Sequence, residues 1–143
     1  MKILMVSSEC VPFAKSGGLA DVVAALSGKL SSMGHDVRIL LPEYSFLNME
    51  KFKIVTKKLI VPMGFRDEKV LFSEGSLPGT KTRVLFAGHP VFTNRVVFMV
   101  TMEATLTEII IIVLHYYLHQ LFHILCLKNG YLTLFILMTG LLA

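Results

Sequence analysis

The strongest constraint on the fold is a strand–loop–helix–strand pattern near the start of the chain. Lys2–Val6 is a short apolar run, typical of a strand buried on both faces of a parallel sheet. Apolar residues then recur at helical spacing over Leu19–Met33, and Gly34 is placed to end this helix in a left-handed conformation. Val37–Leu41 is a second apolar run. The pattern predicts a βαβ unit and, with it, a doubly wound α/β domain.

The remaining elements are predicted from the same periodicities. The helix is expected to bury one apolar stripe, formed by Val22, Val23, Leu26, Leu30 and Met33. Two further strands are expected at Lys53–Val61 and Thr82–Ala87.

Charge divides the chain into two segments. After Arg95 the only charged residues are Glu103, Glu108 and Lys128. The apolar fraction of 54% and the mean hydropathy of +0.67 exclude intrinsic disorder. The net charge of +4 comes from scattered lysines and arginines without a dense run, so no nucleic-acid partner is expected.

Cysteine usage and the first residues bear on location. Cys10 and Cys126 form neither a metal-binding spacing nor a disulfide framework, which fits a reducing cytoplasm. Met1–Val6 is too short an apolar run for a signal peptide. A cytoplasmic protein without a metal or cofactor is therefore expected.

The loop before the first helix is a candidate phosphate-binding site. In open parallel sheets, ligands bind at the carboxyl ends of the strands, where helix N-termini present free N–H groups. Gly17 and Gly18 let the backbone approach a phosphate closely, and Lys15 adds a flexible positive charge. The spacing matches neither the dinucleotide fingerprint nor the P-loop, and glycine pairs before helices are often only structural.

Longer stretches identify a family. Met1–Leu26 closely resembles the N-terminus of bacterial glycogen synthases and plant starch synthases, and its Lys15–Leu19 matches their K-x-G-G-L motif. Gly34–Arg38, Leu41–Tyr44 and His89–Arg95 match the same family in order and spacing. The resemblance covers residues 1–95, which we interpret as the N-terminal part of the catalytic domain.

The resemblance implies a GT-B fold, in which two Rossmann-like domains enclose the active site. It implies transfer of glucose from ADP-glucose to the non-reducing end of an α-1,4-glucan, with retention of anomeric configuration. Residues 1–95 would be an incomplete half of such an enzyme, so glucan elongation by this chain alone is not expected. We assign no catalytic residue within it.

The same resemblance implies roles for individual residues. Lys15 would contact the phosphates of ADP-glucose, and Gly17 and Gly18 would let the backbone close around the donor or product. Asp21 could bind a sugar hydroxyl, or it could be an acid favoured in the first turn by the helix dipole. Glu9, at the end of the first strand, could contact the ligand or accept a loop hydrogen bond.

The apolar tail, residues 96–143, does not resemble the family. It can be interpreted in three ways. Glu108 and Lys128 bracket enough uncharged residues to span a bilayer, which would make the chain a membrane-anchored phosphate- or nucleotide-binding module. Alternatively, His115, His119 and His123 share one face of a helix and could bind zinc. The third interpretation is translation in the wrong frame, with no specific membrane role.

Codon arithmetic favours the third interpretation. Regrouping the codons of Phe98–Ala104 one nucleotide earlier forces two glycines and permits a sequence resembling the family's Gly-Ile-Tyr-Gly-Asp-x-Gly. The same shift over Asn129–Gly140 permits a sequence resembling the family's His-x-Asn-Asp-Trp region. We therefore hypothesise that residues 96–143 are an out-of-frame translation, a hypothesis that sequencing the gene across Asn94–Met99 would test.

Overall fold

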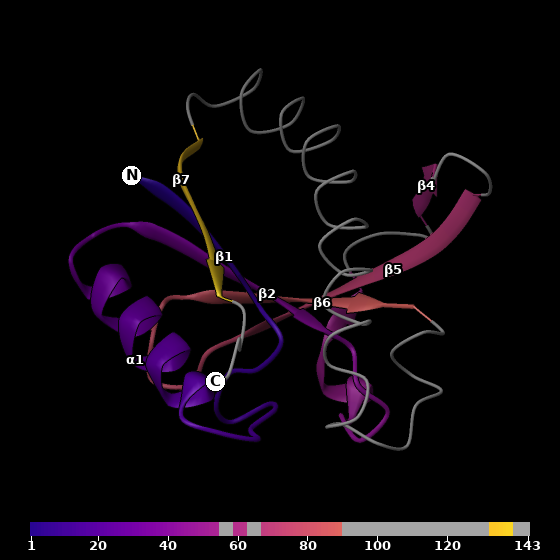
Figure 1. The fold of residues 1–143 in the computed structure, drawn as a ribbon, viewed down its shortest axis with the longest axis horizontal. Helices are drawn as coiled ribbons and strands as arrows, with labels where there is room; N and C mark the ends of the chain where they lie inside the picture. Colours follow the sequence, from indigo (N-terminus) through magenta and orange to yellow (C-terminus); the bar gives the residue numbers. More distant parts are fainter. Residues whose placement is uncertain (55–58, 63–66, 90–131, 139–143) are drawn as a thin grey trace.

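The computed structural model describes residues 1–54, 59–62, 67–89 and 132–138. Its elements in chain order are β1 (Lys2–Ser7), α1 (Leu19–Ser32), β2 (Asp36–Pro42), the 3-10 helix η1 (Met49–Lys51), β3 (Lys53–Ile54), β4 (Leu59–Pro62), β5 (Asp67–Ser76), β6 (Arg83–Gly88) and β7 (Leu132–Met138) (Figure 1).

The strands form a mixed sheet in the order β3-β5-β6-β2-β1-β7, with β4 also paired to β5. β6, β2, β1 and β7 are parallel to one another, whereas β5 pairs antiparallel with β3, β4 and β6. The predicted βαβ unit is confirmed, since α1 connects two neighbouring parallel strands. The arrangement of these parallel strands and α1 is Rossmann-like, as expected.

The antiparallel side differs from the prediction. The single strand expected over Lys53–Val61 is two strands, β3 and β4, separated by residues 55–58, which lie outside the described residues. Both pair with β5, a ten-residue strand that the sequence analysis missed. Its sequence carries charged residues and Gly75 rather than a continuous apolar run, so periodicity alone does not identify it as a strand.

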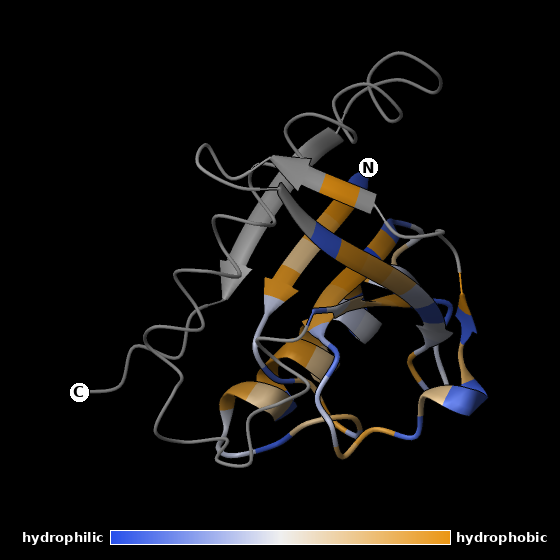
Figure 2. Ribbon diagram, turned by 90° about the vertical axis from the view of Figure 1, so that its right-hand side faces the viewer, coloured by the Kyte–Doolittle hydropathy of each residue, from blue (hydrophilic) through white to orange (hydrophobic). Residues whose placement is uncertain are grey.

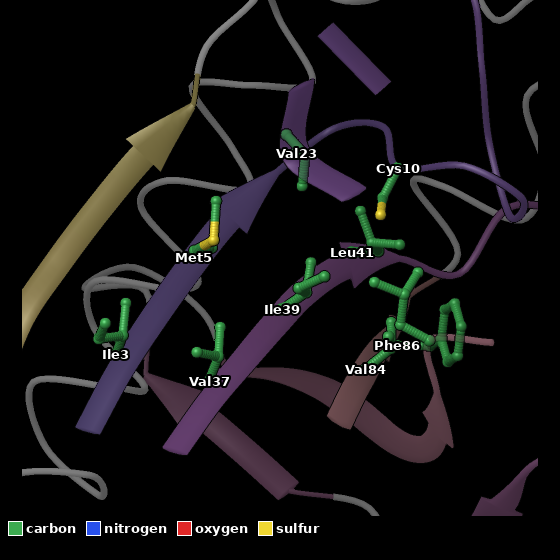
Figure 3. Close-up of a cluster of buried hydrophobic side chains, with 10 residues drawn as sticks. Ile3, Met5, Cys10, Val23, Val37, Ile39, Leu41, Val84 and Phe86 are labelled. Carbon is green, nitrogen blue, oxygen red and sulfur yellow. The ribbon is translucent and has the colours of Figure 1, made fainter. Parts of the chain in front are cut away.

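The core lies between the parallel strands and α1. Alternate residues of the strands point to one face, because side chains alternate across a strand (Figure 3). The buried cluster on this face consists of Ile3, Met5, Cys10, Val23, Val37, Ile39, Leu41, Leu77, Val84 and Phe86. The intervening Leu4, Val6 and Leu40 are buried as well, and Figure 2 shows how apolar these strands are. Burial on both faces of β1 is therefore confirmed.

The face that α1 buries matches the expected stripe only in part. Val23 is fully buried and Leu30 packs against the core, as expected, whereas Val22, Leu26 and Met33 are exposed. The other fully buried residues of α1 are Ala20 and Ser27. Small residues are buried here because they let α1 lie close to the turn before β6. Thr82 donates from its hydroxyl to the Ser27 carbonyl at 3.3 Å, and a Cβ on Gly28 would meet the Thr80 methyl at 3.3 Å.

One strand lies in the tail. β7 pairs in parallel with β1, and Ile3 aligns with Leu134. The candidate membrane segment and the stripe of His115, His119 and His123 lie outside the described residues. Within the ranges that the structure describes, no helix combines the length and the apolar character needed to cross a membrane.

The end of β2 lies close against the end of β6. The amide of Glu43 donates to the Ala87 carbonyl at 2.9 Å, and one Glu43 carboxyl oxygen would lie 2.6 Å from a Cβ on Gly88. A side chain at position 88 would therefore require the Glu43 carboxyl group to move. The oxygen Oε2 of Glu43 is buried, and none of the described residues forms a hydrogen bond with it. This burial raises the pKa of the Glu43 carboxyl above its ordinary value of 4.5.

Gly34 supports a first prediction. It ends α1 with a φ of +88°, as expected, and a side chain there is strained. We expect Gly34→Ala to lower the free energy of unfolding by about 1–2 kcal/mol. Gly17→Ala is the matched control, because Gly17 lies outside the left-handed region and a Cβ there meets nothing within 4 Å. Urea denaturation of the 143-residue chain measures both; equal losses would contradict the prediction.

Glu43 supports a second prediction. Because its pKa is raised, the folded chain keeps this proton to a higher pH than the unfolded chain does. The Glu43 contribution to stability therefore falls as the pH rises from about 4.5 through the folded-state pKa. We expect Glu43→Gln to flatten this part of the profile when urea denaturation is repeated across that range. Glu50→Gln, which removes an exposed carboxylate from η1, is the control. Parallel wild-type and Glu43→Gln profiles would contradict the assignment.

Candidate functional site

The candidate site lies at the carboxyl ends of the parallel strands. Because β1, β2 and β6 run in the same direction, the residues that follow them meet at one edge of the sheet. These residues are Ser8 and Glu9 after β1, Glu43 and Tyr44 after β2, and His89 after β6. The loop from β1 then leads into the first turn of α1 at the same edge (Figure 1).

The first half of this loop is fixed to the core. Cys10 and Ala14 exchange two backbone hydrogen bonds of 3.0 Å, and the amide of Val11 donates to the Ala20 carbonyl at 3.3 Å. The Cys10 side chain is fully buried in the apolar cluster (Figure 3). Burial raises its pKa to about 11, so the thiol stays protonated at neutral pH and serves as a small apolar group.

The second half of the loop is held by Glu9. One oxygen of its carboxyl group, Oε2, accepts hydrogen bonds from the amide of Ser16, from the Ser16 hydroxyl at 2.9 Å and from the amide of Gly17 at 3.2 Å. Glu9 itself is 3% exposed. Of the two roles considered for this residue, the loop hydrogen bond is confirmed.

Lys15 and Asp21 form an ion pair across the loop. The Lys15 ammonium lies 2.8 Å from Oδ2 and 3.0 Å from Oδ1 of Asp21, and both side chains are about half exposed, at 54% and 55%. Asp21 lies in the first turn of α1, where a negative charge complements the helix dipole. An ammonium has three protons, so a lysine that donates twice to Asp21 keeps one for another acceptor.

Neither Gly17 nor Gly18 is explained by the backbone or by packing. Gly18, the N-cap of α1, has ordinary helical angles (φ −71°, ψ −19°), and Gly17 also lies outside the left-handed region. A Cβ at either position would meet no atom of the described residues within 4 Å. As far as these residues go, the space in front of both glycines is open, unlike the space at Gly88, which the Glu43 carboxyl group fills.

Tyr44 forms a hydrogen bond with the backbone just before Glu9. Its hydroxyl donates to the Ser8 carbonyl at 2.8 Å, and its ring stacks on Phe46 with centroids 5.3 Å apart. Burial, with a smaller contribution from the negative charge of Glu9, raises the pKa of Tyr44 well above its usual value. The phenol therefore remains a hydrogen-bond donor at any physiological pH.

The structure brings together all four residues that the sequence analysis assigned to ligand binding: Lys15, Gly17, Gly18 and Asp21. Their contact with ADP-glucose stays a prediction. The sequence did not predict the hydrogen bond from Tyr44 to Ser8, because Tyr44 was noted only as part of the Leu41–Tyr44 motif. Among the described residues, no group of three or more His, Cys, Asp or Glu side chains could hold a metal ion.

Comparisons with known proteins agree on one family. Residues 2–108 match the family model of the starch synthase catalytic domain, a range that continues past Arg95. Glycogen synthase 1 of Geobacter sulfurreducens is 46% identical over 98 residues, which are 66% of this chain and 20% of that protein. Glycogen synthase of Geobacillus stearothermophilus is 52% identical over 68 residues, covering 46% of this chain and 14% of that protein.

A solved structure extends the similarity to the fold. The catalytic domain of starch synthase IV from Arabidopsis thaliana, bound to ADP and acarbose, superposes with a TM-score of 0.56 at 27% identity. The match covers 68% of this chain and 20% of that one. The chain thus spans about a fifth of the length of the Geobacter sulfurreducens and Arabidopsis thaliana proteins. Because the family model covers most of the sequence, the chain belongs to the starch synthase catalytic domain family.

Proposed function

We propose that this chain is the donor-binding N-terminal segment of a glycogen or starch synthase. The complete enzyme would transfer glucose from ADP-glucose to the non-reducing end of an α-1,4-glucan, with retention of configuration. The family match supports the class of enzyme, and the solved neighbour, bound to ADP and acarbose, supports a nucleotide and a glucan-like ligand. A cytoplasmic location is part of the proposal and is compatible with Cys10 being a free, buried thiol.

The observation that carries this proposal is the open start of α1, with the Lys15 ammonium beside it. The first amides of a helix have no intrahelical acceptor, and they point toward whatever lies in front of the N-terminus. Here, Gly17 and Gly18 leave that space free of side chains, so a diphosphate can approach the backbone of the chain closely. A fixed set of N–H donors would stabilise the charge that gathers on the diphosphate when it leaves the sugar.

Lys15 would supply the cation beside this backbone. It lies directly before Ser16 in the loop, and the pair with Asp21 holds its ammonium near the first turn of α1. The remaining ammonium proton is available to a phosphate oxygen. In this scheme, Asp21 orients Lys15, and its contact with a sugar hydroxyl would be an additional role.

A third prediction concerns the chain by itself. Because it spans about a fifth of its relatives, it cannot enclose a donor between two domains. We expect the purified 143-residue chain to incorporate no glucose from ADP-glucose into glycogen, measured with radiolabelled donor. Incorporation above that of a heat-denatured sample would contradict this prediction.

A fourth prediction tests Lys15 in a complete enzyme. A chimaera in which residues 1–95 replace the matching segment of the Geobacter sulfurreducens enzyme would restore the rest of the protein. We expect Lys15→Ala to lower kcat/KM for ADP-glucose by about 10²–10³-fold, the usual loss when one group that stabilises developing charge is removed. Gly17→Ala should also lower kcat/KM, although we expect the same substitution to leave stability unchanged.

Lys81→Ala is the control for these variants. Lys81 is exposed in the turn before β6, and it therefore lies at the amino ends of the parallel strands, away from the candidate site. Its removal changes the net charge by the same amount as Lys15→Ala. Equal activity of the Lys15→Ala and Lys81→Ala chimaeras would overturn the proposed role of the loop.

A further inference from the structure

Glu9 connects a rigid part of the molecule to an exposed one. Its own backbone is fixed at the end of β1, where the Ser7 hydroxyl donates to the Glu9 carbonyl at 2.9 Å and accepts from the Glu9 amide at 3.3 Å. Tyr44 fixes the preceding carbonyl from the neighbouring strand. Ser16 and Gly17, in contrast, are exposed. The carboxyl group thus ties a surface loop to a buried strand end.

The hydrogen bonds of Glu9 divide the loop amides into two groups. The amides of Ser16 and Gly17 are already used, because both donate to Glu9. Within the described part of the chain, no acceptor is recorded for the amides of Gly18 and Leu19, which begin α1. An incoming diphosphate would therefore meet Gly18 and Leu19, while the two preceding residues stay bound to the protein.

The negative charge of Glu9 cannot attract the donor diphosphate, so its contribution must come from positioning the loop. A carboxylate near a diphosphate repels it, so the charge of Glu9 does not favour donor binding. What Glu9 supplies is an acceptor at a fixed place. All three hydrogen bonds end on the single oxygen Oε2, so one carbonyl-like oxygen at that place is enough to make them.

We propose that Glu9 is a positioning residue: by holding the Ser16 and Gly17 amides, it sets the Lys15–Gly18 loop in the geometry that receives the donor diphosphate. This inference rests on the proposed function and adds a residue to it. It separates the acceptor oxygen from the negative charge, and these two properties can be tested independently. A glutamine at this position keeps the oxygen and loses the charge, whereas an alanine loses both.

The first arm of the test uses the 143-residue chain itself. Hydrogen exchange followed by mass spectrometry reports on the peptide that contains Ser16 and Gly17. We expect Glu9→Ala to speed its exchange and Glu9→Gln to leave it protected, because the amide oxygen of glutamine still accepts. Ser16→Ala, which removes only the hydroxyl donor, should change the exchange little. Equal exchange in Glu9→Ala and wild type would overturn the proposal.

The second arm uses the chimaera and separates donor from acceptor. We expect Glu9→Ala to lower kcat/KM for ADP-glucose by about 10²-fold, the cost of a small misplacement in a binding site, while KM for glycogen stays unchanged. Glu9→Gln should retain most of the activity. If Glu9→Ala raises both KM values together, or if Glu9→Gln is as impaired as Glu9→Ala, the positioning role is wrong.

Lys15→Ala distinguishes failure of this inference from failure of the proposed function. If Lys15→Ala loses activity and Glu9→Ala does not, the loop binds the donor without help from Glu9, and only the positioning role falls. If neither variant loses activity, the donor does not bind at this loop at all. Should Glu9→Ala fail to fold, Glu9→Gln with Ser16→Ala provides the comparison, and a tenfold or greater loss in Glu9→Gln alone would overturn the proposal.

Discussion

The structure depends on the parallel pairing of β1 with β2, buried on both faces. Burial on both faces requires continuous apolar strands. Because β1 and β2 are parallel, they can be joined only by a crossover, which α1 supplies. The parallel direction also brings the ends of β1, β2 and β6 to one edge. The contact between Tyr44 and the Ser8 carbonyl is a direct result, since it joins residues that are 36 positions apart in the sequence.

The residues of the candidate site are held less firmly the farther they lie from the end of β1. Ser8 and Glu9 take their positions from the buried strand, and Ser16 and Gly17 take theirs from Glu9. Lys15 is held only by a half-exposed ion pair, an interaction that is weak in water and screened by salt. The charge held by the weakest of these interactions therefore lies at the exposed side of the loop, where an anion would arrive, and the hydrogen bonds of Glu9 lie behind it.

Local patterns predicted the βαβ part of the fold because each of its elements is specified by neighbouring residues. Lys2–Val6 and Val37–Leu41 are recognisable from their apolar runs alone, and Gly34 from its place after the helix. The predicted buried face of α1 was correct at Val23 and Leu30 but wrong at Val22 and Leu26, because close packing against the turn before β6 buries Ser27 instead. Only the three-dimensional contact decides between them.

The candidate site was predictable in composition but not in its internal contacts. Lys15, Gly17, Gly18 and Asp21 form a compact motif, so short-range pattern recognition finds them. The hydrogen bonds of Glu9 cross seven and eight positions of an irregular loop, and no periodicity links such residues. β5 was missed for a related reason, because its partners β3, β4 and β6 define it more than its own sequence does.

The two sides of the sheet differ in how far apart in the sequence their partners lie, and this affects the order in which they can assemble. β5 and β6 are joined by a short turn, so their pairing closes a small loop. β7 reaches β1 from the other end of the chain, with Lys2 aligned to Leu132. Closing so long a loop costs more entropy and rewards the chain only after the intervening strands are in place. This difference in loop length favours early pairing of β5 with β6 and later pairing of β7 with β1.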